Sequence, residues 1–332
     1  MSISLSRARA AGALTLALGF TCLPVHASLT LTSDAVGLGF SLSTFATLNP
    51  GSTGYGPFGM AVTGDGRVLI SNYANNQRYV FSDVDGQTPA TALASLPSKS
   101  STVAYATVGG LAYGGENGQF VQFKSNGTVD HVLTGVGRST YLGMWGNLTN
   151  GHIIATSGSG LIDIDPLANG GLGSARVIAA VYGDGVSVSP DGKTAFLAQG
   201  SGFSTYDIAT GQFGYSVSGM PGADGMGVIS SNNALNGHVV VNTNYGEVWM
   251  YDPSNQAKTL LANGGTRGDY VSPDTSNGTL FLAYSDTVMR LSCGAGCGIG
   301  SPSPVPEPES VALVLGGMGV LGLALQRRQR KG

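Results

Sequence analysis

A repeated unit constrains the fold of this 332-residue chain more than any other feature of the sequence. The clearest copy covers residues 184–211. In it, valines alternate with serines at 186–189, a Pro-Asp-Gly triplet follows at 190–192, and a second turn ends the copy at 209–211. The alternation predicts strands and the triplet predicts a turn, because glycine accepts positive φ at little cost. Each unit is therefore expected to form three or four short antiparallel strands.

The same order of strands and turns returns along the chain. The last turn of successive units carries an aspartate or asparagine, and these turns are 43, 39, 42 and 45 residues apart. The turn residues are Asp83, Asn126, Asp165, Asp207 and Asp252. A period near 42 with several short strands per unit is typical of β-propeller blades. Because six units fit between Tyr55 and Cys293, the sequence predicts an all-β, six-bladed β-propeller, with seven blades as the alternative if residues 89–108 form a degenerate unit.

The repeat also predicts how the ring closes. The last unit ends at residues 289–293 without a fourth strand, whereas residues 39–48 form an apolar strand that precedes the first unit. We expect this N-terminal strand to complete the last blade, which would remove an exposed sheet edge. Residues 28–293 would then form one domain that is large enough to bury a core.

The N-terminal end has the pattern of an export signal. Residues 1–27 hold a basic start, an apolar stretch at 10–20, and small residues at the last and third-last positions. This pattern predicts a secretory signal peptide that is cleaved between Ala27 and Ser28. Removal of that peptide leaves two cysteines, Cys293 and Cys297. In an oxidising compartment their close spacing predicts a disulfide that closes a small loop.

The C-terminal end has three parts in a fixed order. A Gly/Ser/Pro linker at 294–304 leads to residues 305–332, which hold a Pro-Glu-Pro triplet, an apolar run at 311–325 and a basic tail. A helix over that run would span only about 23 Å, against a hydrocarbon core of about 30 Å. The run is therefore predicted to be a short transmembrane helix and a poor permanent anchor. An ordinary C-terminal tail anchor is the alternative.

This tail resembles the PEP-CTERM sorting signal of Gram-negative bacteria that secrete exopolysaccharide. The triplet is Pro306, Glu307 and Pro308. In that family the membrane protease exosortase recognises the triplet and removes the anchor. The resemblance implies export through the Sec translocon, transient anchoring in the inner membrane, and delivery to the cell surface or extracellular matrix. The unit at 184–211 in turn resembles the repeats of YVTN/NHL-like propellers.

The charge of the chain between Ser28 and Pro304 narrows the range of partners. This segment has ten basic and 17 acidic side chains. A net charge of −7 excludes the basic surface that nucleic-acid binding requires. We therefore expect no nucleic-acid partner, and an extracellular polysaccharide is the partner that the sorting signal favours.

Three successive units begin their innermost strand with an acid. Asp184, Asp224 and Asp269 stand where the other units have Phe58, Val103 and Leu142. Innermost strands line the channel of a propeller, so these carboxylates are candidate ligands for Ca²⁺. Such a site resembles the central site of metal-dependent lactonases and sugar-acid hydrolases, although the glutamate of that family's ligand set has no match here. The other interpretation is that each aspartate accepts hydrogen bonds from nearby backbone.

The sequence offers no recognisable pairing of a nucleophile with a catalytic base, so no catalytic residue is assigned. A binding or structural module is therefore favoured over an enzyme. The alternative is a calcium-dependent hydrolase or lyase acting on a lactone or sugar acid. Aromatic residues near strand starts could stack on sugar rings, although large aromatics are more often packed in a core. The stacking candidates are Tyr55, Tyr141, Trp145 and Trp249.

Overall fold

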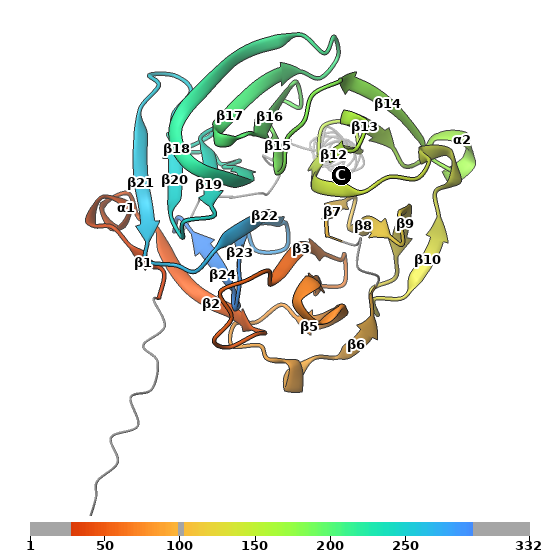
Figure 1. Ribbon diagram of the computed structural model, residues 1–332, viewed down its shortest axis with the longest axis horizontal. Helices are drawn as coiled ribbons and strands as arrows, with labels where there is room; N and C mark the ends of the chain where they lie inside the picture. Colours follow the sequence, from red (N-terminus) through yellow and green to blue (C-terminus); the bar gives the residue numbers. More distant parts are fainter. Residues whose placement is uncertain (1–27, 99–102, 295–332) are drawn as a thin grey trace, which may run out of the picture.

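The computed structural model describes residues 28–98 and 103–294. Within these residues the fold is all-β and propeller-like, with sheets arranged around a central axis (Figure 1). The α-helices in this part of the chain are the short α1 (Ser33–Gly37) and α2 (Ala168–Gly171), and the 3-10 turns are η1 (Tyr73–Asn75), η2 (Pro89–Thr91) and η3 (Thr134–Val136). No helix within these two ranges is long and apolar enough to cross a membrane.

Four of the sheets have four strands each, in antiparallel order from the axis outward. Three of them follow the chain directly. They are β3 (Pro57–Val62), β4 (Arg67–Asn72), β5 (Gln77–Ser82) and β6 (Ala94–Pro97); β7 (Tyr105–Val108), β8 (Leu111–Glu116), β9 (Gln119–Phe123) and β10 (Val129–Val132); and β11 (Tyr141–Asn147), β12 (His152–Ser157), β13 (Gly160–Asp165) and β14 (Ser174–Ala179). The fourth consists of β22 (Gly268–Asp274), β23 (Thr279–Tyr284), β24 (Thr287–Ser292) and β2 (Ser41–Thr47).

The remaining sheet has eight strands, and it corrects the predicted blade count. Its members are β15 (Val186–Val188), β16 (Thr194–Ala198), β17 (Gly200–Asp207), β18 (Phe213–Val228), β19 (Val239–Thr243), β20 (Val248–Tyr251), β21 (Lys258–Asn263) and β1 (Thr30–Leu31). The 16-residue β18 pairs with β17 over its first part and with β19 over its last part, so one strand joins two repeat units. The structure therefore has four four-stranded blades and one eight-stranded sheet, and the expectations of six and of seven separate blades are both wrong.

The predicted closure of the ring is confirmed. The N-terminal strand β2 pairs antiparallel with β24, in a register that runs from Ser41 opposite Ser292 to Thr47 opposite Thr287. Phe45, on the buried part of β2, packs against Phe281 of β23 with 4.8 Å between ring centroids. The first strand after β1 and α1 thus completes the last sheet.

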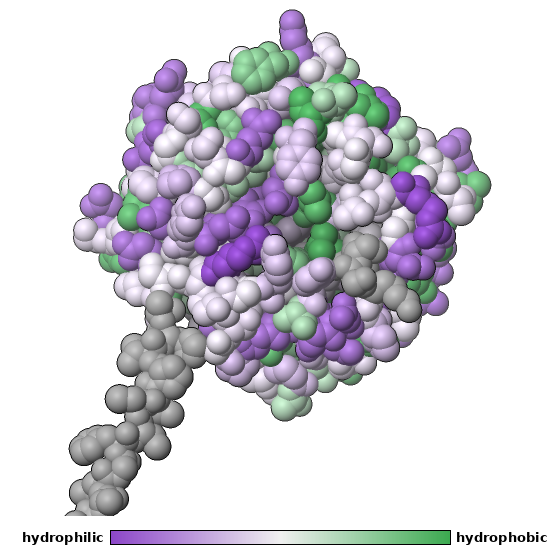
Figure 2. All heavy atoms as spheres, viewed as in Figure 1, coloured by the Kyte–Doolittle hydropathy of each residue, from purple (hydrophilic) through white to green (hydrophobic). Residues whose placement is uncertain are grey.

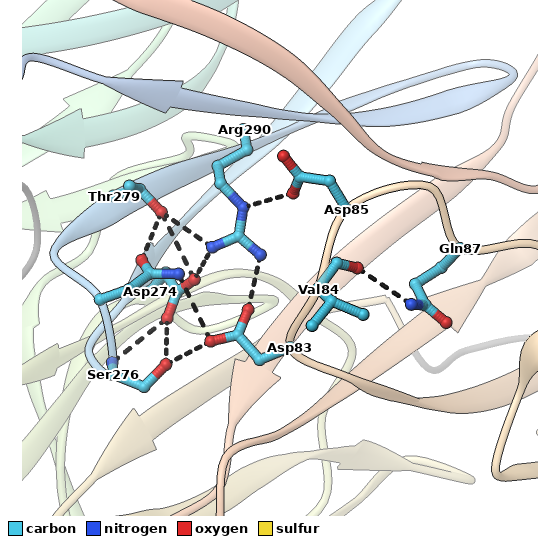
Figure 3. Close-up of polar contacts among 9 residues, drawn as sticks. Asp83, Val84, Asp85, Gln87, Asp274, Ser276, Thr279 and Arg290 are labelled. Atoms are coloured by element: carbon cyan, nitrogen blue, oxygen red, sulfur yellow. Dashed lines mark hydrogen bonds and ion pairs between the residues drawn. The ribbon is translucent and has the colours of Figure 1, made fainter.

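Arg290 on β24 holds this closing sheet to the sheet of β3–β6 (Figure 3). Its guanidinium forms ion pairs with Asp83 and Asp85 in the loop after β5, at 2.5 and 2.8 Å, and with the fully buried Asp274 at the end of β22. The guanidinium carbon also lies 5.0 Å from the ring centroid of Phe45. Buried charges are tolerated when they are paired in this way, so we assign this cluster a structural role.

The innermost strands β3, β7, β11, β15, β18 and β22 contact one another in ring order around the axis. Hydroxyl side chains link neighbouring members. Thr107 Oγ1 on β7 accepts from the Val62 N–H at 2.8 Å and lies 2.9 Å from the Val62 carbonyl oxygen on β3. Ser272 Oγ on β22 donates to the Met60 carbonyl oxygen, also on β3, at 2.9 Å. This packing leaves the mouths of the ring as the places where a ligand can enter.

Several predicted features lie outside the described residues. They are the signal peptide (1–27) with Ala27 of its cleavage site, Cys297, the linker after Gly294, and the segment 305–332 with Pro306, Glu307, Pro308 and the apolar run 311–325. Cys293 is buried just after β24. Its predicted pairing with Cys297 remains a prediction, as does the transmembrane helix.

Candidate binding site

One mouth of the ring holds a pocket of 360 Å³. We call it the ring-mouth pocket, and it is lined by Tyr55, Phe58, Tyr73, Val103, Thr140, Leu142, Tyr182, Asp184, Arg267 and Asp269. Figure 2 shows this face, with hydrophilic and hydrophobic side chains on different sides of the central hollow. The wall thus combines apolar, aromatic and charged groups.

The repeat explains why these residues meet. Five of the six positions that begin an innermost strand line the pocket, namely Phe58, Val103, Leu142, Asp184 and Asp269. Close approach of neighbouring inner strands brings them together. Gly185 shows the reason, because its N–H donates to the Asp224 carbonyl oxygen at 2.8 Å and a methyl group there would collide with that oxygen. The sequence alignment of these positions therefore identified the pocket's floor.

The three acids predicted as metal ligands do converge. Asp224 is buried and lies close enough to Asp184 for the two carboxyl groups to shift each other's pKa. The guanidinium of Arg267 joins the other pair: its Nη2 lies 3.1 Å from Asp224 Oδ2, and its Nη1 binds Asp269 Oδ2. We call these four residues the carboxylate cluster. The sequence analysis missed Arg267, although an arginine two positions before Asp269 is a signal, since converging buried carboxylates need a counter-charge.

Burial controls the protonation of the carboxylate cluster. Burial, together with the neighbouring charges of Asp269 and Asp184, raises the pKa of Asp224 to about 9. Burial also raises the pKa of Asp269 to about 7, against the opposing effect of Arg267, and it raises the pKa of Asp184. These shifts favour the neutral form of the Asp224 carboxyl, which can donate a hydrogen bond to Asp184.

The position of Arg267 argues against the predicted calcium site. A divalent cation would have to contact oxygens of Asp184, Asp224 and Asp269 together. Two of these carboxylates are already bound by the Arg267 guanidinium, which would repel the ion. Among residues 28–98 and 103–294, no group of three or more His, Cys, Asp or Glu side chains could hold a metal. The assignment of these three aspartates as Ca²⁺ ligands therefore stays a prediction, and the Arg267 contacts to Asp224 and Asp269 argue against it.

Of the four predicted stacking residues, the structure places only Tyr55 in the pocket. Its side chain is 58% exposed, and its ring lies 5.9 Å from that of Phe58 and 5.7 Å from that of Tyr73, between centroids. Tyr141 and Trp145, both on β11, are buried in the core and cannot stack on a ligand. Large aromatic side chains on inner strands are commonly packed in the core in this way.

Trp249 is half-buried on β20, away from the pocket, and its Nε1 donates to Glu247 Oε2 at 2.9 Å. Two tyrosines that the sequence analysis did not select, Tyr73 and Tyr182, line the pocket, and Tyr182 is 78% exposed. Tyr73 lies in the connection between β4 and β5, and Tyr182 in the connection between β14 and β15. Both connections lie at the same mouth of the ring as the starts of the inner strands. Loop position, more than proximity to a strand start, distinguishes the exposed rings from the buried ones.

Comparison with known proteins identifies the C-terminal segment of the chain. Residues 304–329 match the family model described as the PEP-CTERM protein-sorting motif. The chain carries a PEP-CTERM sorting motif. The motif implies an exported protein with transient membrane anchoring and with an exosortase as its processing partner. No curated protein matches the chain at a significant level.

The body of the chain is similar to solved structures. A gluconolactonase from Xanthomonas campestris superposes with a TM-score of 0.56 at 15% identity, over 79% of this chain and 94% of that one. A streptogramin B lyase gives a TM-score of 0.47 at 12% identity, over 76% of this chain and 97% of that one. At such identities the likeness to the gluconolactonase shows a shared fold alone.

Proposed function

We propose that this PEP-CTERM protein is an exported binding module that holds a saccharide of an extracellular polysaccharide in its ring-mouth pocket. The observation that carries the proposal is the composition of that pocket. Exposed rings of Tyr55, Tyr73 and Tyr182 lie beside the charged groups of Asp184 and Arg267. Aromatic faces stack on the C–H faces of sugars, and carboxylate and guanidinium groups hydrogen-bond to sugar hydroxyls.

The size and position of the pocket support this assignment. Its 360 Å³ falls in the range of about 300–1,000 Å³ that is usual for small-ligand sites. The pocket at the other mouth of the ring, of 430 Å³, is lined by Thr63, Gly64, Thr107, Gly109, Gly110, Leu148, Thr275 and Ser276, and so offers neither a charged nor an aromatic side chain. The ring-mouth pocket is thus the better candidate for specific recognition.

Export supports a ligand outside the cell. The sorting motif implies that the body leaves the cytoplasm, and we propose the cell surface or extracellular matrix as its destination. An extracellular polysaccharide is the ligand that we propose for the protein there. A rigid ring with loops at one mouth is a suitable frame for such a module.

The alternative function, a calcium-dependent hydrolase or lyase, is disfavoured by Arg267. The enzyme would need a metal at the carboxylate cluster, where the guanidinium binds Asp224 and Asp269. We therefore expect a chelator to leave the melting temperature of the full-length protein unchanged. A lactonase activity that disappears on chelation and returns with Ca²⁺ would establish the enzyme and overturn the binding module.

The direct test is glycan binding by the full-length protein in detergent, screened on an array of oligosaccharides and quantified by calorimetry. Tyr182→Ala should weaken binding of any oligosaccharide found by about two- to tenfold, the effect of losing one aromatic contact. The matched control is Tyr245→Ala, which removes a ring that is 70% exposed and outside the pocket lining. Equal losses in both variants, or no binding of any oligosaccharide, would contradict the proposal.

A further inference from the structure

The ring-mouth pocket already holds one organic cation, the guanidinium of Arg267. Its carbon lies 4.5 Å from the ring centroid of Tyr55, over the aromatic face. On its other sides it binds the carboxylates of Asp224 and Asp269. An aromatic face together with carboxylates is the arrangement that recognises ammonium and guanidinium groups. The wall is therefore complementary to positive charge.

Asp184 extends this complementarity to the open part of the pocket. It lines the pocket and is not one of the two carboxylates that Arg267 pairs with. Tyr182, two residues earlier in the connection between β14 and β15, lines the same pocket and is largely exposed. A ligand that enters the pocket therefore meets a carboxylate and an aromatic ring from one loop.

The charge balance disfavours an anionic ligand. Arg267 is the one basic residue of the pocket lining, and both of its terminal nitrogens are engaged by carboxylates. The lining also includes Asp184, with which Arg267 does not pair, and the segment between Ser28 and Pro304 has 17 acidic against ten basic side chains. A uronic acid would thus place a carboxylate against like charge in a site of reduced dielectric.

From these contacts we infer that the ring-mouth pocket selects a saccharide with a free, protonated amine. The ammonium group pairs with Asp184, and the sugar ring rests on Tyr182. This inference rests on the proposed function and specifies the class of saccharide: amino sugars are preferred over neutral sugars and their N-acetylated forms, and uronic acids are rejected. The exposed tyrosines of the pocket add attraction for the ammonium group through their π faces.

Calorimetry with the full-length protein at pH 6 compares the affinities of four tetrasaccharides, one for each class of saccharide. The probes are β-1,4-linked glucosamine, its N-acetylated counterpart, cellotetraose and tetragalacturonate. We expect the glucosamine tetramer to bind at least tenfold more tightly than the other three. Its binding should weaken as sodium chloride is raised, because a charge pair is screened by salt, whereas that of cellotetraose should not.

Two variants of equal charge change locate the effect. Asp184→Asn should weaken binding of the glucosamine tetramer about tenfold and weaken cellotetraose binding much less, because the amide still hydrogen-bonds to sugar hydroxyls. An unchanged melting temperature shows that the variant is folded. Asp34→Asn, at an exposed acid on α1, should leave both affinities unchanged. If Asp184→Asn fails to fold, the salt dependence of the unmodified protein decides.

The outcomes distinguish the inference from the proposed function. Equal binding of glucosamine and cellotetraose tetramers, or tighter binding of tetragalacturonate, overturns the inference and leaves the saccharide-binding function standing. A salt-independent glucosamine affinity also overturns it. Binding of none of the four, with no signal on a wider glycan array, overturns the proposed function and the inference together.

Discussion

The hydroxyl of Tyr270, on β22, bonds to the backbone of Met144, on β11, across the interior of the ring. It accepts from the Met144 N–H at 2.8 Å, and it lies 2.9 Å from the Met144 carbonyl oxygen and 2.8 Å from that of Tyr105 on β7. Burial raises the pKa of the Tyr270 phenol, so it stays protonated and can donate. One side chain thus connects three inner strands beneath the ring-mouth pocket.

Loss of this hydroxyl should destabilise the ring. Tyr270→Phe leaves the buried Met144 N–H without its acceptor, at a cost of about 1–3 kcal/mol. For a domain of this size we expect a fall of several degrees in Tm, at about 2–4 °C per kcal/mol. Calorimetry checks this against Tyr245→Phe, which alters an exposed phenol. Equal melting of the two variants would show that the Tyr270 contacts contribute nothing.

Close packing of the inner strands gives a second prediction, at Gly225 on β18. A methyl group there would collide with the backbone oxygen of Asp269, because the two strands approach each other closely. Gly225→Ala should cost about 1–3 kcal/mol, as overpacked substitutions do. Gly54→Ala is the matched control, since no atom lies within 4 Å of the added carbon. Denaturant unfolding that ranks the control as the less stable variant would refute the close approach.

Removal of Arg290 should destabilise the protein more than either Tyr270→Phe or Gly225→Ala. Arg290→Ala leaves Asp274, whose side chain is fully buried, without its counter-charge. Breaking a buried pair in this way costs about 3–5 kcal/mol. We expect a Tm about 10 °C lower. Arg138→Ala, at an exposed arginine that donates to the Asn117 carbonyl oxygen, should change Tm little. A wild-type Tm for Arg290→Ala would mean that the buried Asp274 does not require it.

Protonation of Asp224 gives stability a characteristic dependence on pH. Its pKa is about 9 in the folded protein against an ordinary 3.8, so between these values the folded state binds a proton that the unfolded state has lost. Stability is then fully present below about pH 4 and declines as pH rises towards 9. Asp184 and Asp269, whose pKa values burial also raises, change it in the same direction.

Asp224→Asn should flatten this dependence. The amide does not titrate, and its N–H₂ can still donate to Asp184 as the protonated acid does. We expect the fall in Tm between pH 5 and pH 8 to be smaller in the variant than in the wild type by a few degrees. Asp34→Asn, at the surface, should keep the wild-type profile. Parallel profiles for Asp224→Asn and the wild type would contradict protonation of Asp224.

Most of the topology could be predicted from the sequence, because the repeat is visible in the turns. The alternating strands, the turn triplets and the missing strand of the last unit predicted both a propeller and its closure through β2 and β24. The exception is β18. Residues 219–222 read Gly-Met-Pro-Gly, which normally interrupts a strand, yet the backbone there continues from one unit into the next. Local propensity could not reveal that two units share one strand.

The candidate site was predicted in part. Equivalent positions of the repeat identified Asp184 and Asp269 as residues of one site, since a ring brings such positions to one axis. The chemistry was not predictable from those positions alone, because Arg267 reaches the carboxylates from outside the aligned strand starts. The prediction of stacking residues succeeded only for Tyr55 for a related reason. The sequence does not show that the ring of Tyr141 faces the core whereas that of Tyr55 faces solvent.

Closure of the ring through its first and last strands has a consequence for the timing of export. Thr44 on β2 contacts Met289 on β24 across a separation of 245 residues. If the chain crosses a membrane N-terminus first, β2 emerges long before its partner β24. Its edge then stays unpaired until nearly the whole body has crossed. The sorting motif begins at residue 304, shortly after β24. In such a chain, completion of the ring and arrival of the sorting motif at the membrane would fall in the same final stage of export.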